Sequence, residues 1–455
     1  MAAKHRAMPR VGHVSIICMG CSKNLVDSER LARRLSDAGF TVSFDDDVPP
    51  RDSAVVVNTC GFIGDAKEES VNMLLQVSAL REKRKIRRFY VMGCLSERYR
   101  TELADEIDNI DGLYGKFDWD GIVGDLLAHA GEGDTEVAAA GTTEKAWERQ
   151  LKDLPYSAYI KISEGCNRFC SFCAIPLITG RHHSRPADEI IEEMTKLAGE
   201  GTREFNIIAQ DLSSYGRDLA DGGEAPLARL LERMAAVPGA EMIRLHYAYP
   251  SDFPYEILPV IASHANICKY LDIALQHIDD TVLANMRRHI DGAGTRELLA
   301  RIRREVPGIH IRTTLMTGFP GETDEAFERL VEFVKEQRFE RMGAFAYCEE
   351  EGTYGAEHFD DSIAEEVKNA RLDRLMELQE SITEEVAAEK VGKTLRVIID
   401  EILYDGTAQG RTEYDSPEVD CNVYIENRPD LEVGQIYNVK ITSNDLIDLF
   451  GEVVD

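Results

Sequence analysis

Six apolar segments rich in β-branched residues alternate with amphipathic helical patterns between residues 155 and 347, and this alternation constrains the fold most strongly. The expected strands cover 158–163, 204–210, 242–248, 269–275, 309–318 and 341–347, and expected helices include 187–199, 293–305 and 323–337. Strands that alternate with helices form parallel sheets, because a crossover must carry the chain back between neighbouring strands. Six such units predict an incomplete TIM-like (β/α)6 barrel, whose chemistry lies at the C-terminal ends of the strands.

The segments on either side predict two further domains. Residues 1–130 hold three expected parallel strands, at 11–17, 53–58 and 87–93, with helical patterns such as 28–39 and 65–83 between them, so we expect a small α/β domain. Residues 131–150 contain few bulky apolar side chains, and we assign 131–154 to a linker. A charged helix (361–389) ends the barrel domain, 155–389. Short alternating strands in 390–455 predict a small OB-like β-barrel; they are "TLRVIIDEI" (394–402), "NVYIEN" (422–427), "QIYNVKITS" (435–443) and "DLFGEVV" (448–454). The chain is therefore expected to be an α/β multidomain protein.

Composition narrows the class of protein. The chain has no apolar signal-peptide region near its N-terminus and no run of about eighteen apolar residues, which predicts a cytoplasmic protein without a membrane segment. Ten cysteines in a reducing compartment favour metal binding or catalysis over disulfides. A net charge of −30 argues against nonspecific nucleic-acid binding, which needs cations to displace phosphate counterions.

Three cysteines lie within eight residues after the first expected barrel strand: Cys166, Cys170 and Cys173. Structural zinc sites and ferredoxin-type clusters use four protein ligands, so a C-x3-C-x2-C group is one short. Three thiolates on a four-iron cluster would leave one iron open for a small molecule, as in catalytic metal sites. The alternatives are a Cys3His zinc site that uses His182 or His183, and buried structural cysteines.

A second triplet occupies equivalent positions in the N-terminal domain. Cys21, Cys60 and Cys94 each follow one of its three expected strands. The C-terminal ends of parallel strands open on one crevice, so these thiols can converge despite their sequence separation. We interpret them as a second three-thiolate iron–sulfur site; the alternative is three unrelated buried thiols. Cys18 is expected to be a core residue, and a structural role is expected for the remaining cysteines, Cys268, Cys348 and Cys421.

The stretch "YIKISEGCNRFCSFCAIP" (159–176) resembles the signature of radical S-adenosylmethionine (SAM) enzymes. The resemblance implies that the open iron chelates SAM. Phe172 matches an aromatic position beside the cluster and adenine, and Gln210 lies where that superfamily contacts SAM. Core packing of Phe172 and simple polarity at a strand end for Gln210 are the alternatives. Five further residues lie near strand ends and could line a substrate pocket, although ordinary packing explains each of them better: His246, Tyr247, Gln276, His277 and Arg287.

The order of domains resembles the methylthiotransferases, which join a three-cysteine domain, a radical SAM barrel and a TRAM domain. One branch of that family modifies tRNA adenosine, and the RimO branch modifies an aspartate of small-subunit ribosomal protein twelve. "GCSKNLVDSE" (20–29), "LHYAYPSDFP" (245–254) and "GRTEYDSPEVD" (410–420) resemble the RimO branch, although Ser22 replaces its usual proline. Thr314 stands where the tRNA branch tends to carry aspartate.

The resemblance implies an enzyme that adds a methylthio group to the aspartate β-carbon with two 4Fe-4S clusters and SAM. The implied partners are ribosomal protein twelve or the subunit carrying it, an electron donor and a sulfur carrier. Residues 391–455 hold five Lys or Arg and fourteen Asp or Glu, a net charge of −9, which makes tRNA an unlikely partner and suits a basic ribosomal protein. A tRNA methylthiotransferase and a non-catalytic metal-stabilised scaffold are the competing hypotheses.

Overall fold

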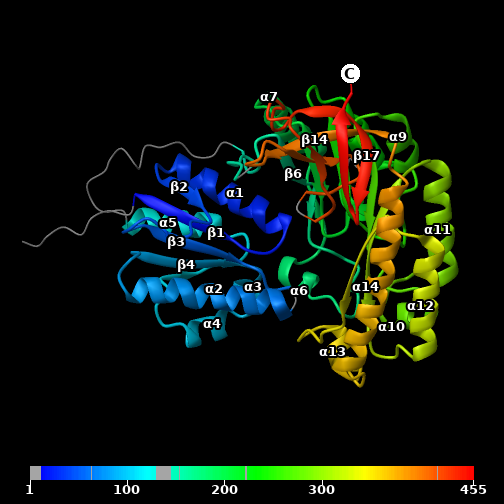
Figure 1. Cartoon of the computed structure of the whole chain (residues 1–455). Coiled ribbons are helices and arrows are strands. Elements are labelled where there is room, and N and C mark those ends of the chain that lie inside the picture. Colours follow the sequence, from blue (N-terminus) through cyan, green and yellow to red (C-terminus); the bar gives the residue numbers. More distant parts are fainter. Residues whose placement is uncertain are drawn as a thin grey trace, which may run out of the picture. The chain divides into compact units, whose positions relative to one another are not determined.

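The computed structural model describes residues 12–62, 64–129, 145–152, 154–220, 223–417 and 419–454 (Figure 1). The chain divides into two compact units, which are residues 1–153 with 177–180 and residues 154–176 with 181–455. Residues 131–144, where most of the predicted linker falls, lie outside the described ranges. No described helix combines the length and the apolar character that a bilayer crossing requires.

The first unit is built on a five-stranded parallel sheet with the order β2-β1-β3-β4-β5 (Figure 1). The three predicted strands are β1 (His13–Cys18), β3 (Ala54–Thr59) and β4 (Arg88–Gly93), and sequence reasoning missed the short edge strands β2 (Thr41–Phe44) and β5 (Gly112–Leu113). The helices are α1 (Ser22–Asp37), α2 (Gly64–Glu82), α3 (Cys94–Arg98), α4 (Arg100–Glu106) and α5 (Trp119–His129).

Helices cover both faces of this sheet, and alternate residues of each strand therefore enter opposite cores. Val14 and Val56 pack with apolar residues of α1 and α5 on one face. Val55 and Val57 pack with residues of α2 and α4 on the other face. Burial on both sides explains why the central strands are nearly continuous apolar runs, which made them recognisable in the sequence.

The second unit contains the predicted partial barrel, a six-stranded parallel sheet with the order β13-β12-β11-β10-β9-β6. Its strands are β6 (Ser157–Lys161), β9 (Glu204–Ile208), β10 (Met242–Ala248), β11 (Ile267–Ile273), β12 (His310–Thr317) and β13 (Arg341–Ala346). Its longer helices are α7 (Ala187–Gly199), α8 (Pro226–Ala235), α11 (Gly292–Glu305), α12 (Asp324–Gln337) and α14 (Glu365–Ala388).

Short elements decorate the loops of this sheet. They are the antiparallel pair β7 (Ser163–Glu164) and β8 (His183–Ser184), the 3-10 turn η2 (Leu212–Ser214), and the helices α6 (Ile175–Thr179), α9 (Ile257–Ser263), α10 (Asp280–Asn285) and α13 (Tyr354–His358). The pair β7–β8 brackets the three-cysteine segment, so its two ends are tied together by backbone pairing at Ser163–Ser184 and Glu164–His183.

The C-terminal strands close into the predicted small barrel, with the order β14-β15-β16-β18-β17. They are β14 (Thr394–Ile402), β15 (Ala408–Thr412), β16 (Val423–Ile425), β17 (Ile436–Asp445) and β18 (Asp448–Val453), of which only β15 was not predicted.

Buried ion pairs join the small barrel to the first residues of the sheet strands. Arg411 pairs with Glu204 at 2.9 Å, Arg341 with Asp415 at 2.5 Å and Arg312 with Asp420 at 2.5 Å. The segment "GRTEYDSPEVD" (410–420) contributes one member of each pair. Its charged residues therefore hold the barrel against the N-terminal ends of the strands, which are the ends away from the cysteine loop.

Candidate functional site

The structure brings Cys21, Cys60 and Cys94 to one edge of the first unit. They follow β1, β3 and β4, which are neighbours in the sheet, and Cys21 caps α1 while Cys94 begins α3. Cys60 and Cys94 are buried and Cys21 is exposed. A Cβ on Gly20 would lie only 2.9 Å from the Cys60 sulfur, so the first and second loops touch through a glycine. The predicted convergence of strand ends explains this arrangement.

Asn24 connects all three cysteine loops through its side-chain amide. Its Nδ2 donates to the carbonyls of Met19 at 3.0 Å and Thr59 at 3.1 Å, and its Oδ1 accepts from the Cys94 thiol at 3.5 Å. The side chain is fully buried. Asn24 lies in the motif "GCSKNLVDSE" (20–29), and the sequence alone predicted no role for it. A buried amide that satisfies groups from three loops holds their geometry more firmly than apolar packing alone.

Charge distinguishes the three thiols. Burial raises the pKa of Cys94 to about 12, and the nearby Cys21 and Cys60 add to the rise. Burial also raises the pKa of Cys60. Desolvation opposes ionisation of Cys21 as well, but the ammonium groups of Lys23 and Lys116 and the Asn24 backbone N–H outweigh it and lower its pKa. Cys21 is therefore the thiol most ready to act as a thiolate ligand.

The second triplet lies on the loop between β7 and α6, which follows the C-terminal end of β6. The backbone N–H of Arg168 donates to the Cys166 sulfur at 3.5 Å, and that of Cys173 donates to the Cys170 carbonyl at 3.0 Å. Cys170 is buried, and its sulfur lies 3.3 Å from Nη1 of Arg288 and 3.4 Å from the Tyr249 hydroxyl. Burial raises the pKa of Cys166 to about 12. The segment thus presents three thiols with hydrogen-bond donors directed at two of them.

The zinc alternative finds no support in the placement of the histidines. His182 contacts the Ser184 hydroxyl at 3.0 Å, and His183 lies 3.6 Å from Asp218. Within the described ranges, no three His, Cys, Asp or Glu side chains are grouped closely enough to hold a single metal ion. Three soft thiolate donors without a fourth ligand instead match the donor set of an iron–sulfur cluster with one open iron.

Phe172 and Gln210 lie beside this loop. Phe172 packs edge-on against Phe319 at 6.4 Å between ring centroids, at the margin of an apolar cluster. Gln210 lies two residues beyond the end of β9, and its Nε2 donates to the carboxylate of Glu164. Its Oε1 is buried, and no protein partner of that oxygen is present in the described structure. Both predicted SAM-contacting residues are thus compatible with a ligand at the loop.

The other strand-end residues have mostly structural surroundings. His246 bonds Asn206 and packs on Tyr270, as expected for a core residue. Nδ1 of His277 accepts a hydrogen bond from the backbone N–H of Asp279. The other ring nitrogen of His277, Nε2, lies 3.7 Å from the carboxylate of Glu322. Tyr247, Gln276 and Arg287 adopt left-handed backbone conformations with φ of 64°, 70° and 58°. Such strain is common where a fold serves a site. Oε1 of Gln276 is also buried, without a hydrogen-bond partner among the residues that the structure describes.

The remaining cysteines differ in part from expectation. Cys268 and Cys421 are buried, in agreement with a structural role. Cys18 ends β1 and is half-buried rather than part of the core. Cys348 is exposed after the end of β13, so burial does not support the structural role expected for it.

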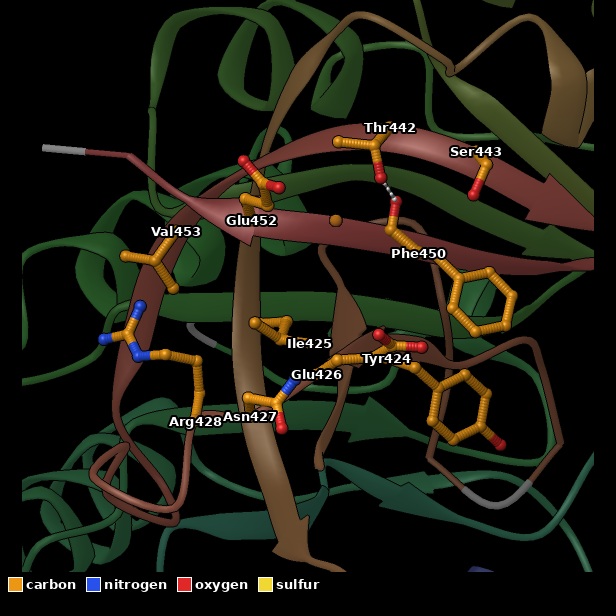
Figure 2. A pocket seen from close by; sticks show the side chains of 11 residues that line it. Tyr424, Ile425, Glu426, Asn427, Arg428, Thr442, Ser443, Phe450, Glu452 and Val453 are labelled. Atoms are coloured by element: carbon orange, nitrogen blue, oxygen red, sulfur yellow. Dashed lines mark hydrogen bonds between the residues drawn. The ribbon is translucent and has the colours of Figure 1, made fainter. Parts of the chain in front are cut away.

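A groove of about 500 Å³ lies on the small barrel, among β16, β17 and β18 (Figure 2). Tyr424 and Phe450 line it as neighbours on the paired strands β16 and β18, with ring centroids 5.6 Å apart, and Glu426 and Glu452 add negative charge. Arg428 also lines the groove and is paired with Asp430 at 2.8 Å. None of the six candidate ligand cysteines contributes to this groove.

Comparison with known families matches most of the chain. Residues 13–115 match the family described as uncharacterized protein family UPF0004, residues 160–334 match the radical SAM superfamily, and residues 391–454 match the TRAM domain. The first range covers the α/β sheet, the second runs from the end of β6 into α12 and leaves out β13, and the third covers the small closed barrel.

The chain is also similar to full-length relatives and to a solved structure. Ribosomal protein uS12 methylthiotransferase RimO of Phocaeicola vulgatus is 54% identical over 97% of this chain and 99% of its own length. The same enzyme of Bacteroides fragilis is 52% identical over the same shares. The radical SAM methyltransferase TsrM from Kitasatospora setae is similar in fold, with a TM-score of 0.56 at 18% identity over 74% of this chain and 75% of TsrM.

Proposed function

The chain belongs to the RimO family of ribosomal protein uS12 methylthiotransferases, and from this we propose that it inserts a methylthio group at the β-carbon of an aspartate side chain of uS12. The observation that carries the proposal is the presence of two thiol triplets, each positioned by backbone and side-chain hydrogen bonds. As functional boundaries we propose 1–130, a linker 131–154, 155–389 and 390–455.

The chemistry explains why a protein would need two such triplets. An aspartate β-hydrogen is not acidic at any pKa that a side chain can match, so general base catalysis cannot remove it. The clusters and SAM of this family supply, when bound, the hydrogen-abstracting species and the methyl group, and the protein provides binding and orientation. We assign Cys166, Cys170 and Cys173 to the SAM-binding cluster and Cys21, Cys60 and Cys94 to the auxiliary cluster.

The surroundings of each triplet fit these assignments. The ammonium groups of Lys23 and Lys116 favour the thiolate form of Cys21, and both lysine side chains are buried beside it. The Asn24 amide keeps the three N-terminal loops in register. At the other triplet, Phe172 would pack against the bound SAM. The buried Oε1 of Gln210 would accept a hydrogen bond from it.

The small barrel suits docking of a basic protein. Its charge of −9 repels RNA phosphates and attracts the lysines and arginines of a ribosomal protein. The groove with Glu426 and Glu452 offers carboxylates beside an aromatic pair, which is a surface that a basic segment can occupy. A substrate on the ribosome implies that the protein works in the cytoplasm. Each turnover consumes electrons and a sulfur atom, so an electron donor and a sulfur carrier are further partners.

The test combines cluster counting with a substrate assay on anaerobically reconstituted protein. We expect about four irons and four sulfides per intact triplet, so alanine replacement of either triplet should halve both. With SAM, a reductant and sulfide, the wild-type chain should modify a peptide of the uS12 loop and leave tRNA unmodified. Modification of tRNA alone, or zinc in place of iron, would overturn the proposal.

A further inference from the structure

Arg288 is a deeply buried cation beside the second cysteine triplet. It lies in the turn between α10 and α11, and the residue is 2% exposed. Nη1 donates to the Cys170 sulfur at 3.3 Å, Nη2 donates to the carbonyl of Ala274, and the guanidinium lies over the Tyr249 ring at 4.1 Å. Nε is buried and has no hydrogen-bond partner in the described structure.

The other deeply buried arginines of the second unit have carboxylate partners. Arg244 pairs with Glu204 at 2.5 Å, Arg371 with Glu322 at 3.0 Å, and Arg341 and Arg411 lie in the ion pairs beneath the sheet. Across the described ranges, Arg288 forms no ion pair with any carboxylate; its contacts are the sulfur, the carbonyl and the ring.

Arg168 provides a close comparison because its guanidinium lies over the same Tyr249 ring, at 4.3 Å. It is neutralised by Asp211 at 2.7 Å and Asp252 at 2.9 Å. Two guanidinium groups thus share one aromatic ring, and only one of them has acidic partners. The negative charge that would balance the second is expected on the sulfur that it contacts.

A buried charge without a counter-charge is strongly destabilising, so native proteins pair it or neutralise it. A guanidinium remains protonated at any relevant pH, which leaves pairing as the available solution. The Cys170 sulfur carries negative charge when it ligates a cluster, and the guanidinium N–H already points at it. The cation therefore matches the loaded state of the triplet.

We propose that Arg288 is the charge partner of the cluster held by Cys166, Cys170 and Cys173, and that it sets the reduction potential of this cluster through its contact with the Cys170 sulfur. The inference rests on the proposed function, since it assumes a cluster at this triplet. Arg288 is a positioning residue, because it acts through a ligand sulfur. Reduction adds negative charge to the cluster, so a neighbouring cation and an N–H···S bond stabilise the reduced form and raise the potential.

The experiment uses the full chain with Cys21, Cys60 and Cys94 replaced by alanine, so that a single cluster is titrated. In this background we compare Arg288→Gln, which removes the charge, and Arg288→Lys, which keeps it. Arg312→Gln is the control, since it removes a guanidinium at the N-terminal end of β12. A redox titration followed by electron paramagnetic resonance measures the midpoint potential of each protein.

We expect Arg288→Gln to lower the equilibrium constant for reduction of the cluster at least tenfold. For one electron this corresponds to a midpoint potential that is lower by about 59 mV. Arg288→Lys should retain most of the potential, and Arg312→Gln should leave it unchanged. An unchanged potential in Arg288→Gln would overturn the inference, and a tenfold loss of SAM affinity at unchanged potential would assign the guanidinium to SAM instead. A triplet that binds no iron with Arg288 intact would overturn the proposed function itself.

A second measurement does not depend on the folding of the glutamine variant. With ¹⁵N-labelled arginine, pulsed electron paramagnetic resonance of the reduced cluster should detect an arginine nitrogen coupled to it, and the coupling should disappear in Arg288→Lys. A loaded cluster without such coupling in the protein that retains Arg288 would also overturn the inference.

Discussion

The thiol of Cys94 donates to the side-chain carbonyl of Asn24 at 3.5 Å, although seventy positions separate the two residues in the chain. The Nδ2 group of the same amide donates to the backbone just after β1, at Met19, and to the last residue of β3, Thr59. One side chain therefore determines the mutual placement of three loops that each carry a candidate cluster ligand. This relationship makes the N-terminal triplet sensitive to a residue that is not itself a ligand.

Replacement of Asn24 by alanine should remove the N-terminal cluster. We expect the iron content to fall by about four per chain and the first unit to lose about 1–3 kcal/mol, because buried carbonyls lose their donors. Iron quantitation and urea unfolding followed by the fluorescence of Trp119 and Trp147 measure the two effects. Asn266→Ala is a matched control: its Nδ2 bonds the carbonyls of Ala235 and Ala240, both at 2.9 Å, and its loss should leave the iron unchanged.

A methyl group on Gly20 should also disrupt this site. Gly20 has φ of 87°, and its Cβ would lie 2.8 Å from the Cβ and 2.9 Å from the Sγ of Cys60. Gly20→Ala should therefore displace Cys60 and lower the iron bound at this triplet at least tenfold under limiting iron. Gly124→Ala is the control, because nothing lies within 4 Å of its Cβ on α5. Normal iron content in Gly20→Ala would show that the loop can yield.

The ion pairs under the six-stranded sheet predict an acid-sensitive second unit. Desolvation opposes ionisation of Glu204, but Arg411 and Arg244 outweigh it and hold its pKa well below the usual range. The ionised carboxylate thus stabilises the fold above its unfolded pKa of about 4.3, and this contribution disappears as the pH falls toward the folded pKa.

Glu204→Gln should destabilise the second unit by about 3–5 kcal/mol at pH 7, because two guanidinium groups remain buried without it. The difference from wild type should narrow below about pH 4. Hydrogen exchange of the β9 and β14 amides, corrected for intrinsic rates, measures the stability difference between the variant and the wild type at pH 7 and below about pH 4. A gap of equal size at both pH values would contradict the assigned charge state of Glu204.

Charge reversal in the groove should slow capture of the ribosomal substrate. Glu426→Lys with Glu452→Lys changes four units of charge beside the Tyr424–Phe450 pair. We expect association with uS12 to slow about tenfold at low salt and the difference to shrink as salt screens it. The control makes the same change on exposed residues of α14, Glu377→Lys with Glu380→Lys. Stopped-flow measurements compare the association rates of the groove variant and the α14 variant. Equal slowing in both variants would assign the effect to net charge alone.

The sequence was sufficient for the fold because its signals are local and repeated. Apolar runs predicted the central strands of both sheets within a few residues, and β14 begins and ends where the pattern predicted. The strands β2 and β5 are short and only partly buried. β15 was missed because its sequence, AQGRT, contains a glycine and polar residues and has no alternation of apolar side chains. The N-terminal triplet followed from topology, since residues after adjacent parallel strands must share an edge, whereas the second triplet followed from its local C-x3-C-x2-C spacing.

The sequence by itself determined the order of domains, the strands and the six candidate ligands, because spacing and periodicity are properties of neighbouring residues. Only the tertiary structure decided which other side chains serve them. Arg288 and Cys170 are 118 positions apart, and an arginine in a helix-connecting turn carries no local mark of a sulfur partner. Such a residue is recognised as a buried arginine that has no carboxylate partner. Because burial and ion pairing arise only when the chain folds, the sequence alone cannot reveal it.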